Sequence, residues 1–180
     1  MIATSNPSTY FFKRVMLTIL MVIITLPGTH LLANEIFPTP LLKTKAENLQ
    51  LSQAVREAET RMRNFFKNQE TKAIEINIAL LPSAAMNYHL AGFVPKSKTG
   101  NAAILINANW LEYGMTDEAL VRLILEGTGA LIEYQLKGQI TDGGQLLANN
   151  LSNIYRDADK TPQKAAAIQL NGIETKVYFQ

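Results

Sequence analysis

The sequence predicts one α+β domain over residues 46–180, in which a small mixed sheet is packed by an N-terminal amphipathic helix and a long central helix. Three observations predict this class. Apolar residues recur at helical spacing over 46–68 and 116–138. Two shorter segments between them have the alternating or continuous apolar pattern of strands. Finally, an Asn-Gly pair joins two strand-like segments near the end of the chain, which predicts a C-terminal β-hairpin.

Residues 1–33 have the composition of a signal peptide. Two basic residues precede the apolar run 15–26, which is shorter than the roughly 20 residues that a membrane-spanning helix needs. We therefore expect export, with cleavage near Ala33, and a periplasmic or extracellular location. Alternatively, the apolar segment continues to Ala33, and residues 15–33 anchor the protein in the inner membrane.

Charge and composition exclude several function classes. Lys13 and Arg14 are the only charged residues of the segment 1–33, and the whole chain has 17 basic and 15 acidic residues. The remainder therefore carries no net charge, which gives no support to nucleic-acid binding. The chain has no cysteine, so disulfides, thiolate metal ligands, a cysteine nucleophile and a lipid-anchored cysteine are excluded.

The first helix of the domain is predicted over residues 46–68, after a linker. Residues 34–45 contain two prolines and show no periodicity, which is typical of a linker. Over 46–68, charged residues of both signs fill the gaps between the apolar positions. This pattern predicts a helix that covers a sheet rather than one that lies on a membrane surface.

Two strands follow. In residues 73–81, Ile74, Ile76, Ile78 and Leu80 alternate with less apolar residues, which predicts a strand with the β-branched residues on its buried side. Residues 82–101 contain repeated turn signals and are predicted to be a loop. The short apolar segment 102–107, AAILIN, predicts a central strand.

The long central helix is predicted over 116–138. Thr116 is suited to the N-cap, and Gly138 follows the last helical turn. Gly127 and Gly129 lie in the interior, where each glycine costs roughly 1 kcal/mol relative to alanine. The pair therefore needs a functional reason or a packing reason, such as the close approach of another helix or a strand.

The chain then continues with a short helix and the hairpin. Asp142 is suited to cap a helix that runs to about Tyr155. The predicted inner face of this helix consists of Leu147, Leu151 and Ile154. A polar connection over 156–164 leads to the hairpin segments AIQL and IETKVYF on either side of Asn171-Gly172.

Residues 105–138, LINANWLEYGMTDEALVRLILEGTGALIEYQLKG, resemble part of a zincin-type metallopeptidase-like domain of large bacterial secreted proteins, which often also carry repeats-in-toxin-type or cadherin-like modules. In those relatives the run looks like LNADWLA…LLEEIGHAIDAQLN and is followed by GDEGELFAALL. The resemblance extends from about Ile74 through the hairpin. It implies an exported, metallopeptidase-like domain.

The resemblance also implies that the reactive groups are missing here. Those relatives have E-E-x-x-H where zinc peptidases have H-E-x-x-H, a motif that places two metal ligands on one helix face beside a general-base carboxylate. Glu126 matches the first ligand position, but Gly127 stands at the position of the general base and Ala130 at that of the imidazole. Asp142 matches the later segment, whereas Gly143 replaces a glutamate. The resemblance therefore favours a pseudoenzyme without a cofactor.

Four residues remain candidates for binding: Glu126, Glu133, Asp142 and His89. Glu126 and Glu133 are two helical turns apart, roughly 10 Å along the axis, so they do not easily share one ion. We expect solvated or capping carboxylates, and a solvated or hydrogen-bonded His89. Only an altered but working site would bind a metal. Zinc would then need further ligands, whereas an all-carboxylate set suits a harder cation such as calcium.

Three functions are compatible with these observations. The leading interpretation is a non-catalytic binding or structural module with a protein or peptide partner. The alternatives are a metal-dependent hydrolase that uses Glu126, Asp142 and His89, and a membrane-anchored envelope protein that binds through its aromatic residues. The aromatic residues near the predicted sheet edge are suited to a peptide or sugar groove or to the core: Tyr88, Phe93, Trp110 and Tyr113.

Overall fold

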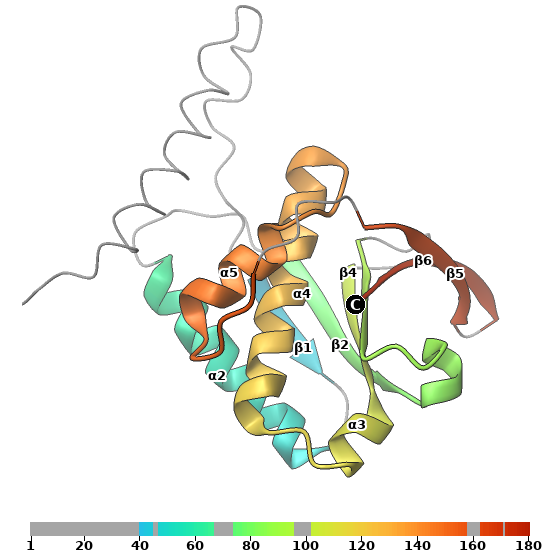
Figure 1. Ribbon diagram of the computed structural model, residues 1–180, viewed down its shortest axis with the longest axis horizontal. Coiled ribbons are helices and arrows are strands. Elements are labelled where there is room, and N and C mark those ends of the chain that lie inside the picture. Colours follow the sequence, from blue (N-terminus) through green and yellow to red (C-terminus); the bar gives the residue numbers. More distant parts are fainter. Residues whose placement is uncertain (1–39, 45–46, 67–73, 96–101, 158–162, 171) are drawn as a thin grey trace, which may run out of the picture. The chain divides into compact units, whose positions relative to one another are not determined.

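A computed structural model of the chain describes residues 40–44, 47–66, 74–95, 102–157, 163–170 and 172–180 (Figure 1). The chain divides into two units, Met1–Phe37 and Pro38–Gln180, and the structural description concerns the second. The predicted signal peptide or anchor lies outside the described residues. None of the helices in the described part of the chain is both long and apolar enough to cross a membrane.

The fold is α+β and is built on a mixed sheet of six strands in the order β1-β2-β4-β3-β6-β5. The strands are β1 (Pro40–Thr44), β2 (Ile74–Leu81), β3 (Ala91–Val94), β4 (Ala102–Asn107), β5 (Ala165–Leu170) and β6 (Ile173–Phe179). β1, β2 and β4 run parallel, and the other pairs are antiparallel. Leu81 pairs with Asn107, so β2 and β4 end at the same edge of the sheet.

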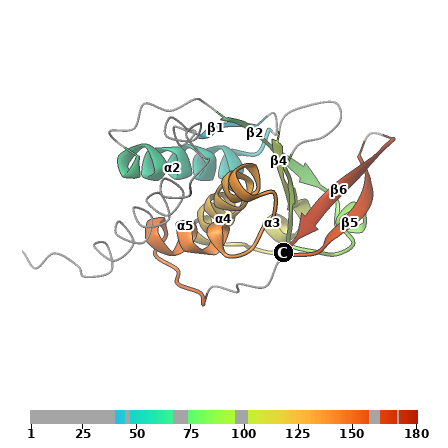
Figure 2. The same ribbon diagram turned by 90° about the horizontal axis from the view of Figure 1, so that it is seen from above.

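Three helices lie on one side of this sheet (Figure 2). They are α2 (Leu49–Phe65), α4 (Asp117–Lys137) and α5 (Gly143–Leu151). α2 and α4 pack against the strands of the sheet, and α5 packs on α4. The short α3 (Ala108–Glu112) and the 3₁₀ helix η1 (Ser83–Met86) follow β4 and β2 at the edge where these strands end.

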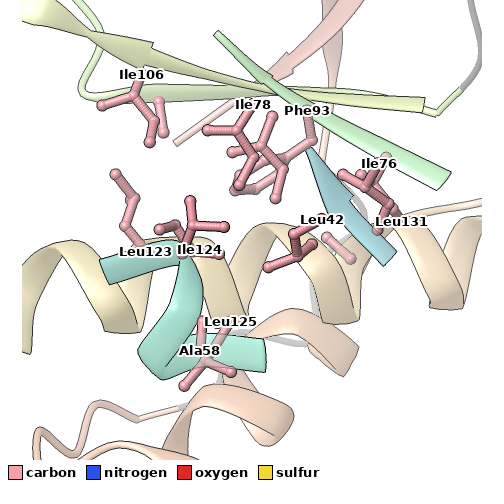
Figure 3. Packing of buried hydrophobic residues seen from close by; sticks show 14 of the residues in the cluster. Leu42, Ala58, Ile76, Ile78, Phe93, Ile106, Leu123, Ile124, Leu125 and Leu131 are labelled. Carbon is pink, nitrogen blue, oxygen red and sulfur yellow. The ribbon is translucent and has the colours of Figure 1, made fainter. Parts of the chain in front are cut away.

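The main core lies between the sheet and the helices (Figure 3). Ile76, Ile78 and Phe93 from the strands meet Ile124 and Leu131 from α4 in this cluster. A second cluster uses side chains that alternate with those of the main core in β3 and β4, which is expected because neighbouring strand residues point to opposite faces. Its members are Met86, Val94, Leu105, Ile168 and Val177. The sheet is therefore buried on both faces where β4, β3 and β6 are neighbours.

Most predicted elements are confirmed. The helix predicted over 46–68 spans Leu49–Phe65, where the Asn48 side chain accepts a hydrogen bond from the backbone N–H of Leu51. The strands β2 and β4, the long helix α4 and the closing hairpin lie where the sequence predicts them. Gly172 adopts a φ of 76° in the hairpin turn, a conformation that glycine reaches without steric cost.

Three segments differ from the prediction. β1 lies within the predicted linker 34–45. Pro40 is compatible with a strand here because it is the first residue of an edge strand that pairs with β2, a position where its missing N–H breaks no ladder hydrogen bond. The predicted loop 82–101 contains η1 and β3, whose four-residue length is too short to show periodicity. α5 ends at Leu151 rather than near Tyr155 because Ser152 has an extended backbone.

Candidate functional site

The middle of α4, where the sequence places the candidate site, is enclosed by protein. The helix has the predicted caps: the Thr116 hydroxyl accepts a hydrogen bond from the backbone N–H of Ala119, and Gly138 adopts a left-handed φ of 71°. Between these ends, all residues from Leu120 to Glu133 are buried. A helix that is buried on every side contacts neighbours all around rather than lining an open cleft on one face.

The two interior glycines of α4 have packing reasons. A Cβ atom on Gly127 would lie 2.9 Å from side-chain atoms of Ile104 and Phe93 in the sheet. A Cβ atom on Gly129 would lie 2.8 Å from the backbone oxygen of Gly143 in α5. The pair therefore lets α4 lie close to a strand on one side and to a helix on the other, as the packing interpretation predicted.

Glu126 is buried, with 2% of its surface exposed. The side-chain amide of Gln180 donates a hydrogen bond of 2.6 Å to its Oε1. Its Oε2 lies 3.8 Å from Nη2 of Arg122, one helical turn earlier. The prediction of a solvated carboxylate is therefore wrong for Glu126, because charged and amide partners replace water around it.

Arg122 is the cation of this buried cluster. Its Nη1 donates hydrogen bonds to the backbone oxygen of Ile154 and to the hydroxyl of Ser152. Burial lowers the pKa of Arg122, the Glu126 carboxylate opposes that shift, and Arg156 adds to it. Arg122 therefore connects α4 to the segment after α5, and its buried charge lies beside that of Glu126.

Glu133 is also buried, with 4% of its surface exposed, and it acts as a cap for a neighbouring helix. The backbone N–H groups of Thr141 and Gly143 donate to its Oε2 at 2.8 and 3.0 Å. Its Oε1 accepts hydrogen bonds from the Thr141 hydroxyl and from Lys137. Burial by itself raises the pKa of Glu133, but these hydrogen bonds outweigh it and hold the pKa below its usual value.

Asp142 occupies the residue before α5, as predicted, but its side chain makes no capping hydrogen bond. The prediction that Asp142 caps α5 is therefore wrong, because its backbone is helical, with φ −107° and ψ −5°, rather than extended as in a capping residue. Oδ1 of Asp142 instead lies 3.3 Å from the Thr141 hydroxyl, whose single proton it shares with Glu133. Thr141 thus lies between Asp142 and Glu133, and it links these two candidate residues.

His89 belongs to a different part of the structure. Its exposed ring stacks on that of Phe179, with centroids 4.4 Å apart and planes 14° apart. Over the described ranges, no three His, Cys, Asp or Glu side chains are grouped so as to hold a metal ion. The candidate residues therefore belong to three surroundings: Glu126 with Arg122, Glu133 with Asp142, and His89 alone with an aromatic ring.

The positions where the resemblance places the missing reactive groups are packed. Ala130 is buried, and a Cβ atom on Gly144 would lie 3.2 Å from the Ala130 Cβ. A Cβ atom on Gly143 would lie 2.9 Å from Oε2 of Glu133. Larger side chains at these positions would push α4 and α5 apart.

Sequence reasoning missed three residues that hold this region together: Arg122, Thr141 and Gln180. Arg122 and Glu126 are four residues apart on a predicted helix, a spacing that indicates a side-chain pair. No sequence signal connects Thr141 with Glu133 or Gln180 with Glu126. These contacts arise only when α5 and the end of β6 pack beside α4.

Comparison of the chain with family models, with curated proteins and with solved structures gave no match. The resemblance to metallopeptidase-like domains of bacterial secreted proteins stays a prediction.

Proposed function

We propose that the protein is an exported, metallopeptidase-like module without catalytic activity, and that it acts by binding another protein or as a structural component in the periplasm or at the cell surface. One observation carries the proposal. Each position of α4 that the chemistry would use is already occupied in packing or in an internal hydrogen bond: Glu126, Gly127, Ala130 and Glu133.

The two carboxylates of α4 support this proposal through their partners. A general base needs a carboxylate that reaches substrate or a bound water. Glu133 instead accepts four hydrogen bonds from Lys137, Thr141 and Gly143. Glu126 is held between Gln180 and Arg122. Both carboxylates therefore serve the attachment of neighbouring segments to α4.

The glycines and the alanine support it through distance. Restoring a carboxylate at Gly127 would place its Cβ 2.9 Å from the buried Ile104 and Phe93, inside the main core. Restoring an imidazole at Ala130 would direct it at the α4–α5 contact, where a Cβ atom on Gly144 would lie 2.3 Å from the backbone oxygen of Glu126. A catalytic site would need a different packing of α5.

The experiment is a paired assay of metal content and peptidase activity on the full chain. We expect no stoichiometric zinc or calcium after purification in their presence, and no hydrolysis of a fluorescent casein substrate above the blank. Glu126→Gln should leave both readings unchanged. Stoichiometric metal together with casein hydrolysis that Glu126→Gln abolishes, in a variant with an unchanged circular dichroism spectrum, would establish the alternative hydrolase with an altered site.

A further inference from the structure

Exposed large apolar side chains occur in the segments that follow the parallel strands at one edge of the sheet. Of the seven in the described part of the chain, four follow the carboxyl ends of the parallel strands: Leu49 after β1, Tyr88 after β2, and Trp110 and Tyr113 after β4. Their exposed fractions are 71, 77, 47 and 80%. We call these four residues the carboxyl-edge surface. Isolated apolar side chains on a surface are ordinary, but a gathering at one edge marks an interaction site.

Hydrogen bonds hold two of these segments together at the edge. The amide of Asn107, a buried residue, donates to the Ser83 hydroxyl and to the backbone oxygen of His89, each at 2.9 Å. The Asn109 side chain accepts a hydrogen bond from the backbone N–H of Ser83. The turn that carries Tyr88 is therefore attached to the start of α3, which carries Trp110.

The third segment joins the same edge through α2. The side chain of Gln50 donates to the backbone oxygen of Met115 at 2.8 Å and to Asp117 at 2.9 Å. The start of α2, which carries Leu49, therefore lies beside the connection between α3 and α4 (Figure 1). In open α/β sheets, ligands bind outside the carboxyl ends of the parallel strands.

The backbone of the Tyr88 turn is held in an unfavourable conformation. Asn87 and Tyr88 have φ values of 48° and 63°, in the left-handed region that costs a bulky L-residue energy. The backbone N–H of Tyr88 donates to the oxygen of Ser83, which closes the turn. The Tyr88 ring is exposed to solvent, so packing of this ring in the core does not account for the backbone strain.

Charge at this edge has one sign. In the described residues 47–52, 81–90 and 107–117, Glu47, Glu112 and Asp117 are exposed, and there is no lysine or arginine. Lys45, before the first of these segments, lies outside the described residues. Aromatic faces attract cations, and carboxylates beside them pair with the same groups. A polyanion such as nucleic acid would be repelled. The complementary partner is cationic.

We propose that the carboxyl-edge surface binds a segment of another protein in which lysine or arginine side chains alternate with aliphatic ones. The inference rests on the proposed function, because it names where a binding module would bind and what chemistry it would recognise. Trp110, Tyr113 and Tyr88 supply rigid faces for aliphatic stems and cations, as aromatic anchors do in protein interfaces. Glu112 and Asp117 supply the charge that selects basic over acidic segments.

The test is selection from a random twelve-residue peptide library on the immobilised full chain, followed by affinity measurements on the enriched peptides. We expect enrichment of lysine and arginine beside aliphatic residues. Trp110→Ala and Tyr113→Ala should each weaken binding at least about tenfold. Glu112→Lys should weaken it more at low salt than at high salt.

Two control variants are matched to these changes. Leu136→Ala removes an exposed apolar side chain near the other end of α4, and Asp157→Lys makes the same charge reversal outside the three edge segments. Both should leave peptide affinity within about twofold. Circular dichroism of every variant separates a lost surface from a lost fold, and Tyr113→Ala gives the answer if Trp110→Ala does not fold.

Several results would overturn the inference. Enrichment of acidic peptides, no enrichment, or affinity unchanged in both aromatic variants would exclude a cationic protein segment at this surface. Binding on a glycan array that Trp110→Ala abolishes would assign the surface to sugars instead. Concentration-dependent dimerisation that Trp110→Ala abolishes would assign it to a second copy of the chain. None of these results depends on the metal and peptidase assay, so the two proposals fail separately.

Discussion

At the junction of α4 with α5, functional side chains are buried and hydrogen-bonded, whereas at the carboxyl-edge surface they are exposed to solvent. At the junction, Glu126 and Glu133 are buried, and their oxygens accept hydrogen bonds from neighbouring segments. At the edge, Tyr88, Trp110 and Tyr113 are exposed although aromatic side chains are usually buried. Chemically reactive residue types therefore do not locate a site by themselves. Their exposure and their existing partners do.

Gly144 allows α5 to pack closely against α4, and a larger residue there should destabilise the protein strongly. In Gly144→Ala, the new Cβ atom would lie 2.3 Å from the backbone oxygen of Glu126, and α5 has to move away from α4. We expect a loss of about 3 kcal/mol or more in the free energy of unfolding, measured by urea denaturation of the full chain. Gly138→Ala is the matched control, because nothing lies within 4 Å of its Cβ position and its cost is the left-handed φ alone, about 1 kcal/mol. Equal losses in the two variants would contradict close packing.

The buried amide of Asn107 holds together the segments that follow β2 and β4. Asn107→Ala removes the amide that holds Ser83 and the backbone of His89, and it removes the acceptor for the N–H of Asn109. We expect a loss of about 2 kcal/mol, because buried groups lose their partners. Asn153→Ala, at an exposed asparagine, should change the unfolding free energy by less than about 0.5 kcal/mol. A neutral Asn107→Ala would mean that this edge is not held by the amide.

A smaller effect tests the cap that Glu133 provides, and it depends on pH. Glu133→Gln should cost about 1.5 kcal/mol near pH 7, because the charged acceptor of two backbone N–H groups is lost. The folded-state pKa of Glu133 lies below its usual value of 4.5, so the carboxylate contributes stability above that value. The contribution is lost as the pH falls through the lowered folded-state pKa.

Urea denaturation of both proteins between pH 7 and pH 3 measures this dependence. The difference between wild type and Glu133→Gln should stay constant down to about pH 5 and shrink below it. Glu174→Gln, at an exposed glutamate of β6, serves as the control. A difference that grows as the pH falls would contradict the role of the ionised carboxylate.

The exposed Tyr113 ring should contribute little to the stability of the fold. Tyr113 is 80% exposed, so Tyr113→Ala should change the free energy of unfolding by less than about 0.5 kcal/mol. The same variant is expected to lose peptide affinity. A large loss of stability in Tyr113→Ala would show that the exposed ring serves the fold rather than a partner.

Local sequence signals predict the elements whose ends are marked by capping or turn residues. α4 begins after Thr116 and ends before Gly138, and the sequence Asn171-Gly172 marks the hairpin, so the ends of both elements are predicted. β1 and β3 were missed because Pro40 resembles a breaker and four residues are too few for a period. Their strand conformation depends on pairing with β2, β4 and β6.

The candidate site was predicted in position but not in environment. The sequence indicated that the α4 glycines need a packing reason, and Ile104, Phe93 and α5 supply it. It did not indicate that Glu133 caps α5, because the donors Thr141 and Gly143 come from a turn whose path depends on tertiary packing. Solvation of a carboxylate is set by such neighbours, which a helical pattern does not specify.

Amide hydrogen exchange, followed by NMR on the full chain with and without zinc, distinguishes a packed α4 interior from an open metal site. If the middle of α4 is a packed junction, the amides of residues 121–133 exchange only through global unfolding, with the free energy measured by urea denaturation. The exposed segment 110–114 should exchange through openings of much lower free energy, and zinc should change neither. Low-energy local opening at residues 126–130, with slower exchange there when zinc is added, would contradict the account.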